Sequence, residues 1–241
     1  MKKYISLSAS SLRVMALTFM LMDHLWATVV PGNIWLHYLG RLAFPIFAFQ
    51  TAEGYRHTKD FKRYCKRLLV FGLISEIPFN LMLTGSPIFP FHQNVMFTLL
   101  FGLLACREMD GLLENPFGKN LLARCGKLSL IFLGSVVLFP DYGLLGVFTV
   151  LTFHLIRGIP GAWLVQLTMM IAIHVFGFEG QVIPLFGGAL EIPIQGLAVL
   201  ALVPIWLYTG EKGTGGKWLQ YGSYLFYPGH MLLLWLYSLL A

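Results

Sequence analysis

Six ionisable side chains lie inside long apolar stretches of this 241-residue sequence: Asp23, His24, Arg41, Glu76, His174 and His230. An ionisable group at the centre of a lipid bilayer costs about 2.5 to 3.5 kcal/mol on insertion scales, so each one needs a partner or a function. A histidine that follows an acid, as His24 follows Asp23, is well placed to move protons near neutral pH. His24 is therefore our first candidate for a chemical role.

The other polar groups are predicted to lie at a similar depth. Arg41 is about as far from the first loop as Asp23 is, which favours an ion pair between them, and that pair is either structural or part of a site. Glu76 and His230 each lie about nine residues into an apolar segment. We interpret His174, alone among Ile and Met, as structural. The alternative for the whole layer is helix-to-helix hydrogen bonding.

The composition predicts helices in a membrane as the elements that position these groups. Hydrophobic residues make up 57% of the chain, charged residues only 12%, and the mean hydropathy is +0.71, far from soluble averages. We expect an all-α integral membrane protein with about nine transmembrane helices in one domain, residues 1–241. Apolar runs place the helices near 12–30, 34–54, 67–84, 93–108, 127–140, 143–157, 160–178, 189–208 and 222–240, the fifth and sixth being short enough to form one broken hairpin.

Basic residues predict the orientation. The net charge of +6 does not indicate nucleic acid binding, because the basic residues lie between apolar segments, as the positive-inside rule describes. The loop after the second segment should be cytoplasmic, which puts the N-terminus inside and the C-terminus outside. Alternation then leaves Arg41 as the only basic residue elsewhere. The cytoplasmic set is Lys2, Lys3, Arg13, Arg56, Lys59, Lys62, Arg63, Lys66, Arg67, Arg107, Lys119, Arg124, Lys127, Arg157, Lys212 and Lys217.

Familiar motifs of soluble enzymes are missing. The sequence has no Walker motif, no dinucleotide-binding glycine pattern in a suitable setting and no HExxH zinc pair. Its three cysteines should stay reduced on the cytoplasmic side, so we expect neither disulfides nor a metal. The basic loop from Arg56 to Arg67 suits phosphate groups, although topology alone explains it. Pro78 follows Glu76 closely and should kink its helix beside a cavity.

Several blocks of the sequence, taken together, resemble the TraX family. They are RVMALTFMLMDHLW, GRLAFPIFAFQTAEGYRHT, RLLVFGLISEIPFNL, QNVMFTLLFGLLA, DYGLLGV and FYPGHMLLLW, and they span nearly the whole chain in order. The family is named for the enzyme that acetylates the N-terminus of conjugative pilin. In the terminal YPxH pattern, Gly229 stands where a larger apolar residue is expected.

The spacing of Arg13 and His24 also resembles helix one of the broader transmembrane acyltransferases. The resemblance implies acetyl-CoA as acyl donor, His24 as catalytic base or acyl carrier, and Arg13 as a cofactor contact. It gives Arg56, Arg63 and Arg67 a role in holding the phosphates of CoA. It also implies a multi-pass protein of the bacterial inner membrane.

From this resemblance we expect acetyl transfer to an amine or hydroxyl acceptor, which is a protein N-terminus, a sugar or a small molecule. Asp23 and Glu76 would orient His24 or hold its charge, and Arg41 or His230 would stabilise the oxyanion. Direct transfer and an acetyl-histidine route both fit. The acyl chain length and oligomeric state stay open.

Two other classes of function remain as alternatives. A small proton-coupled transporter would also place charged groups and Pro-broken helices at the midplane, although the odd helix count and the lack of an inverted repeat argue against it. In a non-enzymatic membrane assembly partner, the polar layer would serve only to hold helices together.

Overall fold

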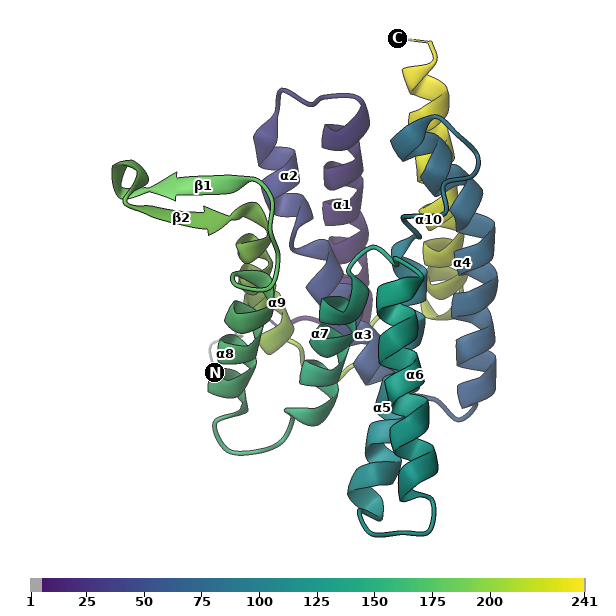
Figure 1. Cartoon of the computed structure of the whole chain (residues 1–241). Coiled ribbons are helices and arrows are strands. Elements are labelled where there is room, and N and C mark those ends of the chain that lie inside the picture. The colour runs from purple at the N-terminus through teal and green to yellow at the C-terminus, as the bar shows by residue number, and fades with distance from the viewer. Residues whose placement is uncertain (1–5, 241) are drawn as a thin grey trace.

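The computed structural model describes residues 6–240, and within them the side chains of residues 185, 186 and 217 are left aside. Lys2 and Lys3, predicted to be cytoplasmic, lie outside the described residues. The chain is largely helical, with one short antiparallel pair of strands (Figure 1). Its elements are α1 (Ala9–Thr28), α2 (Ile34–Gly40), α3 (Ala43–His57), α4 (Phe61–Thr84), α5 (Val95–Glu114), α6 (Leu121–Val137), α7 (Gly143–Leu155), α8 (Ala162–His174), β1 (Val182–Leu185), η1 (Phe186–Gly188), β2 (Leu190–Pro193), η2 (Ile194–Ala201), α9 (Leu202–Trp206) and α10 (Gly216–Ser238).

Every predicted helical segment overlaps a helix, but the segments 34–54 and 189–208 differ in detail. The segment 34–54 is broken into α2 and α3 at Arg41 and Leu42. Pro45 explains the break, because it lacks the amide hydrogen that would bond the carbonyl of Arg41, and its ring would clash with that carbonyl. The fifth and sixth segments form separate helices, α6 and α7.

The predicted helix 189–208 is wrong at its start. Residues Leu190–Pro193 form strand β2, which pairs with β1, and a 3-10 helix follows. Gly187 and Gly188 connect the strands with φ of 71° and 95°, a backbone region that glycine reaches at no steric cost. β-branched residues in the paired positions, such as Ile183 opposite Ile192, favour strands over helix.

The helices run alternately up and down, so the loops gather at two ends of the molecule (Figure 1). One end carries the α1–α2 loop, the β1–β2 hairpin and the C-terminal end of α10. The other carries the loops after α3, α5 and α7, which contain or adjoin Lys59, Lys119 and Arg157. We call this second end the basic end.

The inside and the outside of the helical assembly are both apolar. Leu12, Ile46 and Leu103 are fully buried, whereas Leu73, Leu130 and Leu233 are each more than half exposed on helix surfaces. Exposed apolar patches of this extent mark contact with lipid or another protein. Among the described residues, α4 is the one helix both long and apolar enough to cross a membrane by length and composition, and α7, α8 and residues 194–206 are apolar but shorter.

Candidate active site

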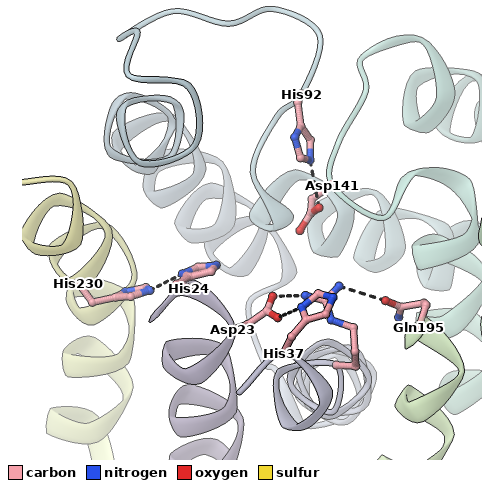
Figure 2. Close-up of polar contacts among 8 residues, drawn as sticks. Asp23, His24, His37, His92, Asp141, Gln195 and His230 are labelled. Atoms are coloured by element: carbon pink, nitrogen blue, oxygen red, sulfur yellow. Dashed lines mark hydrogen bonds and ion pairs between the residues drawn. The ribbon is translucent and has the colours of Figure 1, made fainter. Parts of the chain in front are cut away.

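The centre of the site is a pair of histidines from the two ends of the sequence. His24 lies on α1 and His230 on α10, and the Nδ1 atom of His24 is 2.7 Å from the Nε2 atom of His230 (Figure 2). Their rings are nearly parallel, with centroids 4.9 Å apart. His230 also donates a hydrogen bond of 2.7 Å from Nδ1 to the carbonyl of Phe226. His230 is 5% exposed, whereas His24 is only partly buried and so more accessible.

Asp23 lies beside this pair and has its own partners. It accepts a hydrogen bond of 2.8 Å from Nδ1 of His37 and pairs with the guanidinium of Arg41 (Figure 2). The ion pair predicted between Asp23 and Arg41 is therefore present. Gly40 packs directly against the Asp23 side chain, and any Cβ at this position would overlap it. His37 of α2 and Arg41, which directly follows α2, therefore both contact the Asp23 carboxylate of α1.

A hydrogen-bonded chain continues from Arg41 across the molecule. Arg41 donates to Oε1 of Gln195 at 3.2 Å, and Nε2 of Gln195 donates to Nδ1 of His174 at 3.0 Å. His174 then donates from Nε2 to the hydroxyl of Thr149 at 3.1 Å, which itself donates to the carbonyl of Leu145. Both ring nitrogens of His174 are satisfied, as a structural histidine requires.

Glu76 lies apart from the histidines. Its Oε2 atom accepts hydrogen bonds from the side chain of Asn94 at 2.5 Å and from the Asn94 backbone at 3.3 Å. Asn94 also caps α5 by accepting from the amide of Met96, and it donates to the carbonyl of Gly72. Within the described residues Glu76 has no hydrogen bond to His24, so its contacts join α4 to the start of α5. The expectation that Glu76 orients His24 directly has no counterpart in this geometry.

His92 and Asp141 lie above the histidine pair in Figure 2, on the α4–α5 and α6–α7 loops. The Nε2 atom of His92 is 3.1 Å from the carboxylate of Asp141, and this hydrogen bond raises the pKa of His92. Two backbone hydrogen bonds of 2.8 Å, from Gln93 to Phe139 and from Asp141 to Gln93, join the same loops. The two loops thus form one connected structure beside His24.

A cavity of about 570 Å³ lies between α1, α3, α4 and α10, and neither His24 nor His230 is among its lining residues. Arg13, Lys59, Arg67 and Lys212 line it together with polar groups of α3 and α10. Its other walls include Met20, Leu99 and Tyr227. Met20 is four residues before His24, which is about one helical turn. The cavity is large enough for a cofactor-sized ligand.

The four predicted phosphate contacts separate into two groups. Arg13 and Arg67 line the cavity, and the Nε atom of Arg67 is buried without a hydrogen-bond partner within the described residues. Arg56 donates to the carbonyl of His154 on α7, and Arg63 is exposed on α4. Neither is among the residues that line the cavity.

Sequence reasoning did not single out His37, His92, Asp141 or Gln195 for the site. The three histidine and acid positions fall near predicted interfaces, where a titratable side chain is ordinary. Gln195 carries no charge and gives no signal in an apolar segment. Pro193, two residues before Gln195 in EIPIQG, was the available sign of irregular backbone, because proline lacks the amide hydrogen that a helix needs.

Comparisons with known proteins give a family model and a relative that each match most of the chain. The sequence model of a family described as "TraX protein" matches residues 8–238. The chain is 29% identical over 250 residues to a protein of Dichelobacter nodosus named "Probable fimbrial assembly protein FimC, serogroup H1", covering 97% of each chain. No solved structure matches the chain.

Proposed function

This chain belongs to the TraX family, and we propose that it is a membrane-embedded acetyltransferase. It moves an acetyl group from acetyl-CoA on the cytoplasmic side to an amine or hydroxyl acceptor, with His24 as base or acyl carrier. The observation that carries the proposal is the cavity lined both by basic side chains and by Met20, which lies one helical turn before His24 on α1.

The proposed setting is the cytoplasmic membrane. Outward-facing Leu73, Leu130 and Leu233 suit lipid better than water, and the antiparallel helices put the basic loops at one end (Figure 1). By the positive-inside rule that end faces the cytoplasm, which places the C-terminus outside. The apolar helices shorter than about 20 residues cross as parts of a packed bundle, with the bilayer adapting to their length.

The donor set of the cavity fits acetyl-CoA. Arg13, Lys59, Arg67 and Lys212 supply cationic hydrogen-bond donors for phosphate groups. The unpaired Nε of Arg67 needs an acceptor, because a buried donor without one costs about 1 to 3 kcal/mol. The apolar part, near Met20 and Leu99, suits the thin acyl-bearing arm of the molecule. Arg13 and Arg67 are therefore the proposed phosphate contacts, and Arg56 and Arg63 are not needed.

The proposed acetyl transfer uses only the acceptor, acetyl-CoA and the side chains around His24. The acceptor nitrogen or oxygen attacks the thioester carbonyl carbon and gives its proton to His24, which acts as a general base. The carbon–sulfur bond then breaks, and the protonated His24 returns the proton to the CoA sulfur. Asp23 lies next to His24 and its negative charge favours the imidazolium, while Arg41 holds Asp23 in place. An acetyl-histidine route uses the same side chain.

The acceptor is proposed by class only. The family resemblance suggests a pilin N-terminus, and the relative from Dichelobacter nodosus is named for fimbrial assembly. An amine or hydroxyl would reach His24 from the side on which His92 and Asp141 lie (Figure 2). Donor and acceptor would then meet from the two sides of the membrane.

The test is release of free CoA by the purified protein in detergent, with acetyl-CoA and candidate acceptors. We expect turnover that falls by about 10² to 10⁴-fold in His24→Ala, the usual contribution of a general base. Val14→Ala, a change on the exposed face of the same helix, is the matched control and should keep full activity. An intact, folded protein that neither binds nor consumes acetyl-CoA would overturn the proposal.

A second candidate is a non-enzymatic role in pilus assembly. The relative from Dichelobacter nodosus is named for fimbrial assembly, which favours this role, and the satisfied hydrogen bonds of Gln195 and His174 are typical of structural polar contacts. In that case acetyl-CoA would not be consumed, and His24→Ala would leave pilus assembly nearly intact. The turnover experiment therefore separates the two candidates.

A further inference from the structure

The carbonyl of Phe226 fixes the position of one proton on His230. A carbonyl oxygen only accepts hydrogen bonds, so the Nδ1 atom of His230, 2.7 Å away, must carry a hydrogen. A neutral imidazole has a single N–H. The Nε2 atom of a neutral His230 is therefore an acceptor.

Its surroundings keep His230 neutral. The side chain is 5% exposed, and no acidic residue pairs with it in the described part of the chain. Its neighbours are the rings of His24, Phe226 and Tyr227. A second proton would place an uncompensated cation in an apolar environment beside another imidazole, which is costly.

The proton on His24 follows from the one on His230. With Nε2 of His230 as acceptor, the bond of 2.7 Å between the two rings requires Nδ1 of His24 to donate. In a neutral His24 the lone pair is then on Nε2. The hydrogen bonds thus run in one direction, from His24 through His230 to the backbone of α10.

We propose that His230 is a positioning residue that holds His24 in the tautomer protonated on Nδ1, which makes Nε2 of His24 the reacting atom. The inference rests on the proposed acetyl transfer and names the nitrogen that carries it out. His230 thus takes the orienting role, in place of the oxyanion role expected from the sequence. In catalytic triads of other enzymes a third group does the same for the histidine base.

In this tautomer His24 can act as a base without changing its tautomer or its hydrogen bond to His230. When Nε2 takes a proton from the acceptor, Nδ1 keeps its hydrogen and its bond to His230, and His230 faces a stronger donor. The charged side chains that act on His24 are Asp23, Asp141 and Arg41. In the acetyl-histidine route, the acyl bond would form at the same Nε2, because Nδ1 is already bonded.

The first experiment reads the tautomer directly from ¹⁵N chemical shifts of histidine-labelled protein, with His24→Asn identifying the His24 signals. We expect a protonated Nδ1 and an unprotonated Nε2 on His24 in the wild type and in His230→Gln, whose amide oxygen replaces the acceptor. His230→Phe keeps a ring against Phe226 but removes the acceptor, so we expect a mixture of tautomers. A His24 protonated on Nε2 in the wild type would overturn the proposal.

The second experiment measures CoA release by the same variants. His230→Phe should lower kcat by about 10²-fold, with KM for acetyl-CoA unchanged, because the base is mispositioned but the cavity is intact. His230→Gln should recover most of kcat. Gly229→Ala, whose new Cβ would meet open space next to His230, is the control. A wild-type kcat in folded His230→Phe would contradict the positioning role.

The ¹⁵N chemical shifts and the CoA-release assay test two separate proposals. If the wild type shows the expected tautomer but consumes no acetyl-CoA, the acetyltransferase proposal fails while the effect of His230 on His24 stands. If turnover depends on His24 but the tautomer does not depend on His230, the enzyme proposal stands and the positioning role fails.

Discussion

Asp23 of α1 forms an ion pair with Arg41, the residue at which the chain breaks between α2 and α3. Both side chains are 18% exposed, and Arg41 continues the polar connection to Gln195. The pair therefore joins α1 and the break after α2 to Gln195, which is 154 positions after Arg41. It also fixes the carboxylate that lies next to His24.

Loss of the Asp23 charge should destabilise the fold. Asp23→Asn leaves a largely buried guanidinium without its counter-ion, which costs about 3 to 5 kcal/mol. Asp23→Asn combined with Arg41→Gln should recover much of this loss. Thermal unfolding followed by circular dichroism in detergent measures both, with exposed Glu114→Gln as control. A double variant no more stable than Asp23→Asn would contradict the pairing.

Gly40 should be the glycine of α2 that tolerates no side chain. A Cβ there overlaps the Asp23 carboxylate, so Gly40→Ala should cost about 1 to 3 kcal/mol through overpacking and should lower turnover by displacing Asp23. Gly126→Ala is the matched control, because its Cβ meets open space in α6, and it should stabilise the helix by up to about 1 kcal/mol. Equal melting temperatures for the two variants would show that Gly40 is not tightly packed.

The pairing of Asp23 with Arg41 was predicted from the sequence and is present, but the partners of His24, His230 and Glu76 were not predicted. Counting residues from the helix ends placed His24, His230 and Glu76 in one layer. Pairing depends on which helix faces are adjacent: α10 packs against α1 and brings His230 to His24, whereas α4 turns Glu76 toward Asn94 of α5. Hydropathy does not indicate which helices are neighbours in a bundle.

Residues of the charged loops also have partners that could not be predicted from the sequence. Hydropathy and charge predict that Arg56 lies at the basic end, yet its bond to the carbonyl of His154 depends on α3 packing against α7. The break at Arg41 was predictable in principle, since Pro45 is four residues later. The sequence pattern did not predict the β1–β2 hairpin, because an apolar run with β-branched residues is compatible with a helix or a strand.

The loop contact between His92 and Asp141 should make stability depend on pH. The hydrogen bond to Asp141 raises the pKa of His92 in the folded state, so the folded protein binds this proton more tightly than the unfolded chain. The stabilisation is complete below the unfolded pKa of about 6.5 and is lost as pH rises through the raised folded value.

We therefore expect His92→Gln to lower the melting temperature more at about pH 5.5 than at about pH 8. The pair is partly exposed, with side-chain values of 41% and 37%, so the difference should stay below about 1 kcal/mol. Asp141→Asn should remove the same pH dependence, and the double variant should add nothing. A deficit of equal size at both pH values would mean that the contact does not titrate.

The cavity predicts that two arginines on one helix differ in their effect on acetyl-CoA. Arg67 lines the cavity and Arg63, one turn earlier on α4, is exposed and does not. A charge-assisted hydrogen bond contributes about 1.5 to 3 kcal/mol, so Arg67→Gln should raise KM for acetyl-CoA by about 10 to 100-fold. Arg63→Gln should leave KM within about twofold, as expected for a solvated surface charge.

An acyl donor without the nucleotide distinguishes phosphate binding by Arg67 from a structural role of Arg67. For a short acetyl thioester without phosphate groups, Arg67→Gln and the wild type should have the same KM, because no anion remains for Arg67 to bind. A loss of equal size with both donors would mean that Arg67 supports the fold of the cavity through its contact with the Tyr64 ring, 5.2 Å away. A larger effect from Arg63→Gln would place the phosphates on the outer face of α4, where the basic loop alone would hold them.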